Sequence, residues 1–224
     1  MLFIPKIMFP SLQIALDVVE LSFAEDLASK CWFGDCTWIE AGTPLIKSEG
    51  VKAIRRLRNL LSEAVIVADM KCMDAGFIEV ELAASSGADI ISVLGVASDA
   101  TILEALRASR NYGVKIVVDL ISSLNPLKRA LEVQDLGVDM VCFHMGIDVQ
   151  RALGISVHEG LINYINEACS KLSIPVAVAG GITLDKVKPL MDAGVEVFVV
   201  GSAITRSKDP RKATYEFINL IRGG

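Results

Sequence analysis

The sequence predicts an α/β protein built as a closed (β/α)8 barrel. Three observations lead to this fold class. Eight short runs of β-branched and apolar residues recur along the 224 residues, stretches with helical spacing separate them, and no linker or low-complexity segment interrupts the alternation. A doubly wound open sheet is the alternative architecture. We expect one barrel domain over residues 1–224, in which residues 1–10 are candidates for a short N-terminal extension.

The predicted strands are short and almost continuously apolar, as strands are when both faces of a parallel sheet are buried. In chain order they cover residues 12–17, 37–40, 65–69, 89–94, 114–119, 140–144, 175–179 and 195–200. Runs of this length suit strands better than helices.

The predicted helices lie between these strands and carry apolar residues at helical spacing. They cover residues 50–61, 76–86, 99–112, 126–136, 158–172 and 184–193, and in several cases a glycine stands before the next strand. This regular alternation of strand and helix is the pattern of parallel βα units.

The composition indicates a large core and excludes several classes of protein. With 52% hydrophobic and 22% charged residues, the chain is neither disordered nor a small disulfide-held protein. A net charge of -5 offers no positive field to attract nucleic acid or an anionic membrane. The five cysteines include no C-x-x-C pair, and the apolar runs are too short for a membrane helix. Two prolines interrupt the apolar start of the chain, so we expect no signal peptide and a cytoplasmic protein.

Polar residues end five of the predicted strands, namely Asp17, Glu40, Asp69, Asp119 and His144. In a barrel, the active-site groups emerge from the carboxyl ends of several strands at once. An open sheet offers no comparable reason for such a ring of polar residues, so this feature favours the barrel.

Glu40 and Asp69 end neighbouring strands and are candidate ligands of a divalent cation. Hard ions such as Mg²⁺ take oxygen ligands and keep water or substrate oxygens in their other positions, so two carboxylates suffice. The alternative is that each carboxylate caps a helix or pairs with a nearby lysine.

Lys71 lies between Asp69 and Asp74 on the loop that leaves the third strand. A protonated lysine there can neutralise the negative charge of an enolate or carbanion, while the acids keep it charged and oriented. A solvated salt bridge is the alternative interpretation.

His144 is one of two histidines in the chain, and its position at the end of the sixth strand suits proton transfer to or from a substrate. A core histidine that is held by hydrogen bonds is the alternative. We expect His158, the other histidine, to be a surface or capping residue.

Glycine turns follow the seventh and eighth strands, at Gly180-Gly181 and at Gly201-Ser202. Barrels often bind phosphate at these two places through main-chain N–H groups, so the pair predicts a phosphorylated ligand. Ordinary turns also use glycine. Arg206 is close enough in sequence to assist, or it lies in solvent.

Together these motifs resemble those of the 3-hexulose-6-phosphate synthases, within the orotidine 5′-monophosphate decarboxylase superfamily of barrels. The resemblance covers nearly everything from Leu12 onward. The most specific pieces are LQIALD at 12–17, IEAGTPL at 39–45, DMKCMDAG at 69–76, the GAD at 87–89 that leads to VLG at 93–95, and HMGIDVQ at 144–150.

The resemblance implies an aldolase that joins formaldehyde to ribulose 5-phosphate, with Mg²⁺ as its cofactor and a cis-enediolate as its intermediate. It implies that Glu40 and Asp69 bind the metal, that Lys71 stabilises the enediolate and that His144 moves the C1 proton. It also implies a homodimer with active sites at the interface, in which residues have further roles: Asp17 lines the pocket, Asp74 reaches the partner's site, and Gly180, Gly181, Gly201 and Ser202 bind phosphate.

Three other functions remain open from the sequence. The 3-keto-L-gulonate 6-phosphate decarboxylases share the metal carboxylates and the lysine, but they typically carry an arginine where this chain has Ile147. Orotidine 5′-monophosphate decarboxylases carry a lysine where this chain has Glu40. A barrel that binds a sugar phosphate without catalysis is the third alternative.

Overall fold

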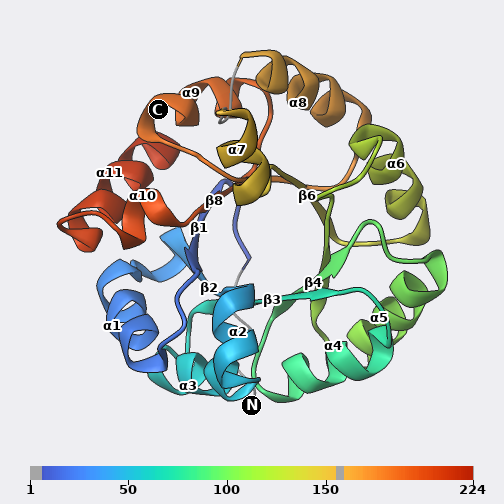
Figure 1. Cartoon of the computed structure of the whole chain (residues 1–224), viewed down its shortest axis with the longest axis horizontal. Coiled ribbons are helices and arrows are strands. Elements are labelled where there is room, and N and C mark those ends of the chain that lie inside the picture. Colours follow the sequence, from blue (N-terminus) through green and yellow to red (C-terminus); the bar gives the residue numbers. More distant parts are fainter. Residues whose placement is uncertain (1–6, 155–158, 224) are drawn as a thin grey trace.

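The computed structural model describes residues 7–154 and 159–223, and its centre is a closed barrel of parallel strands in the order β1-β2-β3-β4-β5-β6-β7-β8 (Figure 1). β1 pairs with both β2 and β8, which closes the ring. The strands are β1 Ser11–Leu16, β2 Thr37–Ala41, β3 Val65–Cys72, β4 Ile90–Leu94, β5 Lys115–Asp119, β6 Met140–His144, β7 Val176–Ala179 and β8 Val197–Val200. This is a TIM barrel, so the predicted fold class is confirmed and the open sheet is excluded.

Helices cover the outside of the barrel, and each predicted helix is present with ends that shift by a few residues at most. They are α3 Lys52–Leu60, α4 Gly76–Ser85, α5 Asp99–Tyr112, α6 Pro126–Leu136, α8 Glu159–Lys171 and α9 Leu184–Asp192. The structure adds elements that the spacing did not single out: α1 Leu21–Cys31, the 3-10 turn η1 Gly34–Cys36, α2 Thr43–Glu49, α7 Ile147–Leu153, α10 Ser202–Thr205 and α11 Pro210–Arg222. His158 lies outside the described residues.

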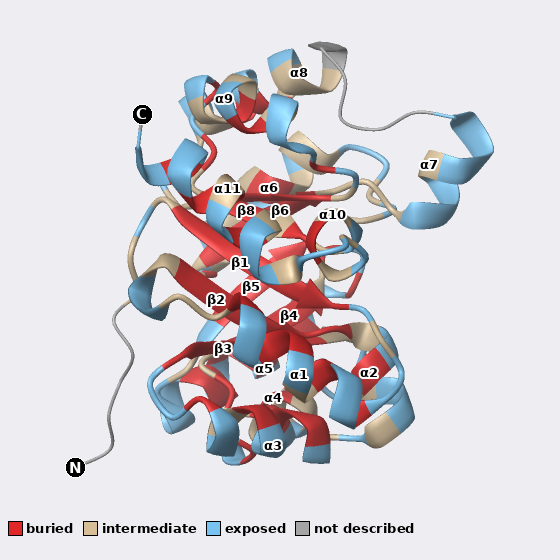
Figure 2. Ribbon diagram, turned by 90° about the vertical axis from the view of Figure 1, so that its left-hand side faces the viewer, coloured by how far each residue is buried: buried red, intermediate tan, exposed pale blue. Residues whose placement is uncertain are grey.

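The short helices α2 and α7 lie over one end of the barrel, inside the outer ring of helices (Figure 1). α7 has no buried residue and stands out from the body of the molecule (Figure 2). Within the described part of the chain, no helix is long and apolar enough to cross a membrane.

Side chains along each strand alternate between the barrel interior and the layer beneath the helices. On β2, Trp38 belongs to the interior cluster, whereas Ile39 belongs to the larger core between strands and helices. Glu40 then points inward again and lines a cavity. Because the strands are parallel, the last inward position of each strand opens at the same end of the barrel, and there the interior changes from apolar to polar.

The opposite end of the barrel contains two carboxylates that repeat one arrangement. Asp89 stands before β4, and its Oδ2 accepts the N–H of Ile66 at the start of β3 at 2.7 Å. Asp139 stands before β6, and its Oδ2 accepts the N–H of Ile116 at the start of β5 at 2.9 Å. Arg58 also binds Asp89. Each carboxylate therefore ties the beginnings of two adjacent strands together.

Candidate active site

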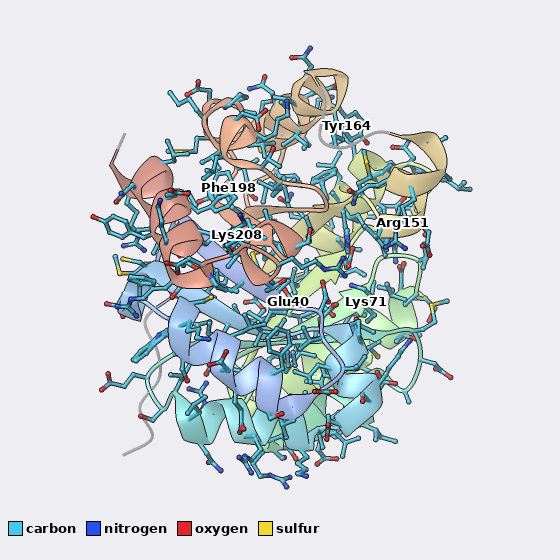
Figure 3. All side chains as sticks on the ribbon, turned by 60° about the vertical axis from the view of Figure 1, so that its left-hand side comes forward. Glu40, Lys71, Arg151, Tyr164, Phe198 and Lys208 are labelled. Atoms are coloured by element: carbon cyan, nitrogen blue, oxygen red, sulfur yellow. The ribbon has the colours of Figure 1, made fainter. Side chains whose placement is uncertain are left out.

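A cavity of about 690 Å³ opens at the carboxyl ends of the strands (Figure 3). It gathers all but one of the candidate residues that the sequence singled out. Those that line it are Asp17, Glu40, Asp69, Lys71, Asp119, His144, Gly180, Gly181, Gly201, Ser202 and Arg206. A smaller cavity of about 260 Å³, lined by Cys169 and Glu196 among others, lies at the amino ends of β7 and β8. The polar groups of the chain therefore converge in the larger cavity, as the barrel fold requires of an active site.

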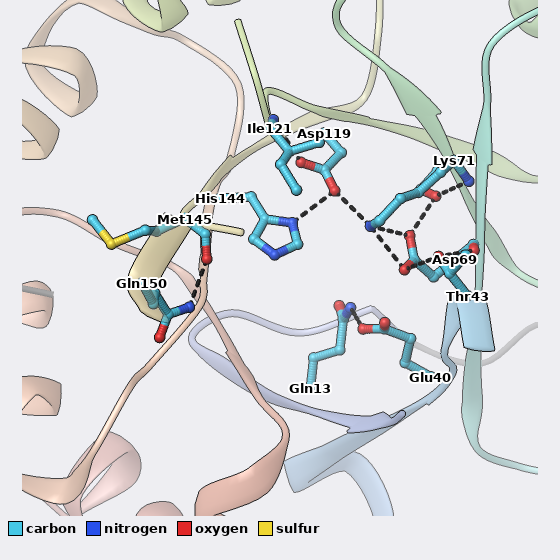
Figure 4. Close-up of polar contacts among 11 residues, drawn as sticks. Gln13, Glu40, Thr43, Asp69, Lys71, Asp119, Ile121, His144, Met145 and Gln150 are labelled. Carbon is cyan, nitrogen blue, oxygen red and sulfur yellow. Dashed lines mark hydrogen bonds and ion pairs between the residues drawn. The ribbon is translucent and has the colours of Figure 1, made fainter. Parts of the chain in front are cut away.

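The charged groups of β3, β5 and β6 form one connected line (Figure 4). Lys71 Nζ lies 2.9 and 2.8 Å from the two carboxylate oxygens of Asp69 and 2.8 Å from Asp119 Oδ2. The same Asp119 oxygen lies 2.8 Å from His144 Nδ1. A single buried oxygen thus joins the lysine to the histidine.

The charges in this line stabilise one another. Burial raises the pKa of Asp119, but the hydrogen bond and charge of His144, followed by the charge of Lys71, outweigh it, so the pKa is lowered to about 2. Burial likewise lowers the pKa of Lys71, but the charges of Asp69 and Asp119 outweigh it and raise the pKa above its usual value. Asp119 is therefore an ionised acceptor and Lys71 a charged donor at neutral pH.

The ionised state of Asp119 determines the tautomer of His144. An ionised carboxylate only accepts hydrogen bonds, so the nitrogen that contacts it, Nδ1, must carry a hydrogen. In the neutral ring this leaves Nε2 as the basic nitrogen. His144 lines the cavity, so the structure presents a base there, oriented by a carboxylate behind it.

The opposite side of the cavity holds carboxylates in a less favourable setting. Glu40 is only 5% exposed and accepts a hydrogen bond from Gln13 Nε2. Burial raises its pKa well above the usual value, and the charges of Asp69 and Asp17 add to the rise. Asp17 lies at the mouth, where partial desolvation and the charge of Asp69 raise its pKa as well. A Cβ at Gly42 would lie 2.4 Å from Asp17 Oδ1, so glycine there makes room for this carboxylate.

The residues at this side of the cavity fit a hard divalent cation. Glu40 and Asp69 supply oxygen donors to the same cavity, and the negative charge of Asp69 adds to the effect of burial in raising the pKa of Glu40. A cation between them would remove that repulsion. Across residues 7–154 and 159–223, no group of three or more His, Cys, Asp or Glu side chains is arranged as a metal site, so the two carboxylates would need oxygens from water or substrate to complete the coordination.

The glycine turns lie at another edge of the cavity and present main chain rather than side chain. Gly180 and Gly181 both have positive φ, at 99° and 71°, and a Cβ on Gly180 would lie 2.2 Å from the carbonyl oxygen of Met145. Gly201 precedes α10, and Arg206 follows it. Main-chain N–H groups and a guanidinium at the same edge suit a phosphate group.

Asp74 is the candidate that the structure does not bring into the cavity. It is exposed on the loop between β3 and α4, and it does not line the pocket of its own chain. A role for Asp74 in its own site is therefore not supported by this geometry.

Several cavity residues had no role predicted for them. Asp119 was expected only as one of the strand-ending polar residues, although it bridges Lys71 and His144. Further polar residues that line the cavity include Gln13, Thr43, Lys47, Ser92 and Arg151. Gln13 and Ser92 did carry a signal, because each is a polar residue inside an otherwise apolar strand. Lys47 of α2 and Arg151 of α7 carried no such signal in the sequence, because their helices are too short to show a periodic pattern.

The sequence matches the family model of the orotidine 5′-phosphate decarboxylase / HUMPS family over residues 10–217. The chain belongs to this family. The match runs from the residue before β1 into α11, so it includes every strand of the barrel.

Relatives within the family resemble the chain along its length. It is 38% identical over 206 residues to a 3-hexulose-6-phosphate synthase from Mycobacterium gastri, which covers 92% of this chain and 96% of that protein. Other relatives are bifunctional Fae/Hps enzymes, of whose length the chain spans about half.

Two solved structures superpose closely on the barrel. A 3-hexulose-6-phosphate synthase gives a TM-score of 0.86 at 37% identity and covers 94% of this chain and 99% of that one. KGPDC from Streptococcus mutans in complex with D-R5P gives a TM-score of 0.88 at 29% identity and covers 96% of this chain and 98% of that one. The backbone thus resembles both, whereas the sequence is more similar to the synthase.

Glu40→Gln should increase the free energy of unfolding at pH 7 in the absence of divalent cations. Because the pKa of Glu40 is raised in the folded chain, protonation of this residue favours folding; that contribution is complete below about pH 4.5 and is lost as the pH rises toward the folded pKa. Glutamine can still accept the bond from Gln13 but carries no charge. We expect the variant to unfold at a higher urea concentration than the parent at pH 7, because the burial and repulsion that raise the pKa of Glu40 no longer act on a charged group.

Urea unfolding of parent and variant at pH 7 and at pH 4 measures this difference. The gain should shrink at pH 4, where most of the repulsion is already relieved by protonation. A variant that is less stable than the parent at pH 7 would contradict the electrostatic account of the cavity.

Proposed function

We propose that this chain is a 3-hexulose-6-phosphate synthase, which adds formaldehyde to C1 of ribulose 5-phosphate to give D-arabino-hex-3-ulose 6-phosphate and also catalyses the reverse cleavage. The observation that carries the proposal is the line Asp69–Lys71–Asp119–His144, which puts a base and a fixed cation in one cavity with two further carboxylates. Similarity to synthases at 38% sequence identity supports it.

The reaction begins with removal of a proton from C1 of the ketose. In the proposed role, His144 Nε2 takes this proton, and Asp119 holds the ring and stabilises the imidazolium that forms. The product is a cis-enediolate whose C1 then attacks the carbon of formaldehyde. A proton transferred to the formaldehyde oxygen completes the addition, and no covalent bond to the enzyme is needed.

Lys71 stabilises the negative charge of the enediolate without leaving its charged state. Its ammonium group is fixed by Asp69 and Asp119, so little reorganisation accompanies the chemical step. We propose that Glu40 and Asp69 hold Mg²⁺, which supplies Lewis-acid stabilisation of the enediolate oxygens. Asp17, at the mouth of the same cavity, is proposed to contact the hydroxyl groups of the sugar.

The phosphate group anchors the far end of the substrate. We propose that main-chain N–H groups at Gly180, Gly181, Gly201 and Ser202 bind it, with Arg206 beside them. Binding energy from this unreactive end holds C1 against the base.

The second candidate function is decarboxylation of 3-keto-L-gulonate 6-phosphate, which passes through the same enediolate. The close superposition on KGPDC favours it. The residue three positions after His144 counts against it, because Ile147 lines the cavity with an apolar side chain where an arginine is expected in the decarboxylases.

We further propose that the protein is a homodimer in which Asp74 completes the partner's site. Asp74 is exposed beside the apolar side chains of Met73, Ile78 and Leu82, which are 52%, 58% and 48% exposed. A second copy packed on this face would bury these side chains and bring the acid to a neighbouring cavity.

All five cysteines are free, which suits a reducing compartment such as the cytoplasm.

Purified protein should consume formaldehyde only when ribulose 5-phosphate and Mg²⁺ are both present, and EDTA should stop the reaction. A parallel assay measures CO₂ release from 3-keto-L-gulonate 6-phosphate. Release of CO₂ with constant formaldehyde would replace the proposal with the decarboxylase. If neither reaction proceeds while ribulose 5-phosphate still raises the unfolding temperature, a binding protein without catalysis is favoured.

His144→Ala should slow exchange of the C1 proton of ribulose 5-phosphate with solvent deuterium by about 100-fold or more, since general bases contribute at least that much. The exchange is followed by NMR with Mg²⁺ and without formaldehyde, so it reports proton removal alone. Exchange at the parental rate in a folded variant would assign the base to another residue.

Asp74→Asn and His144→Ala should each inactivate the dimer and restore activity when co-refolded. A mixed dimer has one complete site only if Asp74 acts across the interface, so a statistical mixture should recover about a quarter of the parental activity. No recovery, or a monomer by light scattering, would remove the shared site from the proposal.

A further inference from the structure

The ladder between β3 and β4 is interrupted where the candidate residues lie. Ala68 pairs with Ile91, and the next matched pair is Cys72 with Val93. Between these two pairs β3 has three residues, at 69–71, where β4 has only Ser92, and the three include Asp69 and Lys71. Such a bulge redirects side chains, but it also leaves main-chain groups without their ladder partners.

Ser92 lies on β4 opposite this irregularity and supplies a partner from its side chain. Its Oγ accepts the N–H of Lys71 at 2.9 Å. Lys71 has a φ of 48°, a left-handed conformation that is unfavourable for a residue with a side chain. The hydrogen bond from Lys71 to Ser92 therefore supports a strained main chain at the residue that carries the ammonium group.

The same hydroxyl group is also a hydrogen-bond donor, to the carboxylate of Asp69. Ser92 Oγ donates to Asp69 Oδ1 at 2.8 Å. Thr43 Oγ1 lies 2.6 Å from the other oxygen, Oδ2, so each carboxylate oxygen has one hydroxyl donor in addition to Lys71 Nζ. A carboxylate has about four acceptor positions. The two hydroxyl groups take two of them and Lys71 Nζ takes the other two, so the hydroxyl groups fix how the carboxylate faces the lysine, and a bound Mg²⁺ would take the place of a lysine contact.

We propose that Ser92 is a positioning residue, which orients the Asp69 carboxylate and the Lys71 main chain relative to each other. Ser92 is 4% exposed, so its single hydroxyl satisfies its bonding potential by accepting from Lys71 and donating to Asp69. The inference rests on the proposed function, because the orientation matters to a site in which Asp69 binds Mg²⁺ and Lys71 stabilises the enediolate.

Ser92→Ala tests the inference by two measurements. We expect Mg²⁺ binding, measured by titration calorimetry on the protein without substrate, to weaken and kcat to fall, each by about 10- to 100-fold, as is typical when a group behind a metal ligand is lost. KM for ribulose 5-phosphate should change little, since the phosphate edge of the cavity is untouched. Ser92→Thr keeps the hydroxyl group on a β-branched residue that suits a strand and should restore both values.

Ser109→Ala is the matched control. Ser109 is also a buried serine, but it lies on α5, and its hydroxyl donates to the carbonyl oxygen of Leu106 away from the cavity. Its substitution should leave Mg²⁺ binding and kcat unchanged. Ser92→Cys, which keeps a side chain of similar shape but a weak hydrogen-bonding group, replaces Ser92→Ala in the comparison if the alanine variant does not fold.

Parental Mg²⁺ affinity and kcat in the folded Ser92→Ala variant would overturn the inference, as would a folded Ser92→Thr variant as impaired as the alanine variant. The calorimetric arm uses Mg²⁺ alone and therefore separates the two proposals. If the parent binds Mg²⁺ but does not consume formaldehyde, the proposed function fails, while the effect of Ser92 on Asp69 is still decided by the change in Mg²⁺ affinity.

Discussion

The site depends on one oxygen atom, Oδ2 of Asp119, which contacts both Lys71 and His144. Because this carboxylate stays ionised, it holds the lysine in its charged state and fixes the histidine tautomer at the same time. Two requirements of the proposed reaction, a cation for the developing charge and a base for the proton, would thereby be met through one buried acid. The position of Asp119 follows in turn from the strand order, since β5 lies between β3 and β6, the strands that carry its two partners.

The same cavity also illustrates a conflict between folding and function. Glu40 and Asp17 are held in a setting where their ionised forms are disfavoured, and neighbouring negative charge adds to the effect of desolvation. A core selected for stability alone would not retain such a group. Its presence is understandable if the chain folds around charges that a ligand later neutralises, which is a common compromise at active sites.

Much of the architecture was predictable because it depends on local pattern, and the remainder depends on contacts distant in sequence. The apolar run of β6 ends at His144 in the sequence and in the structure. β3 was expected to end at Asp69, but the bulge carries it to Cys72, and bulges depend on the partner strand. Helix α1 carries buried residues at helical spacing, so it was predictable from the sequence, but it was not among the predicted helices. The bridge by Asp119 joins residues 48 and 25 positions away, a distance at which no spacing rule applies.

The repeated carboxylate ties at Asp89 and Asp139 have a consequence for how such a barrel changes over generations. Each tie fastens one pair of strands at the amino ends, while the groups proposed for chemistry lie at the carboxyl ends of the same strands. Selection for stability therefore acts mainly at the amino ends of the strands, and selection for activity acts mainly at the carboxyl ends. Mutations at the carboxyl ends can alter which substrate is accepted without weakening the hydrogen bonds at the amino ends. This physical separation allows one scaffold to support several related reactions.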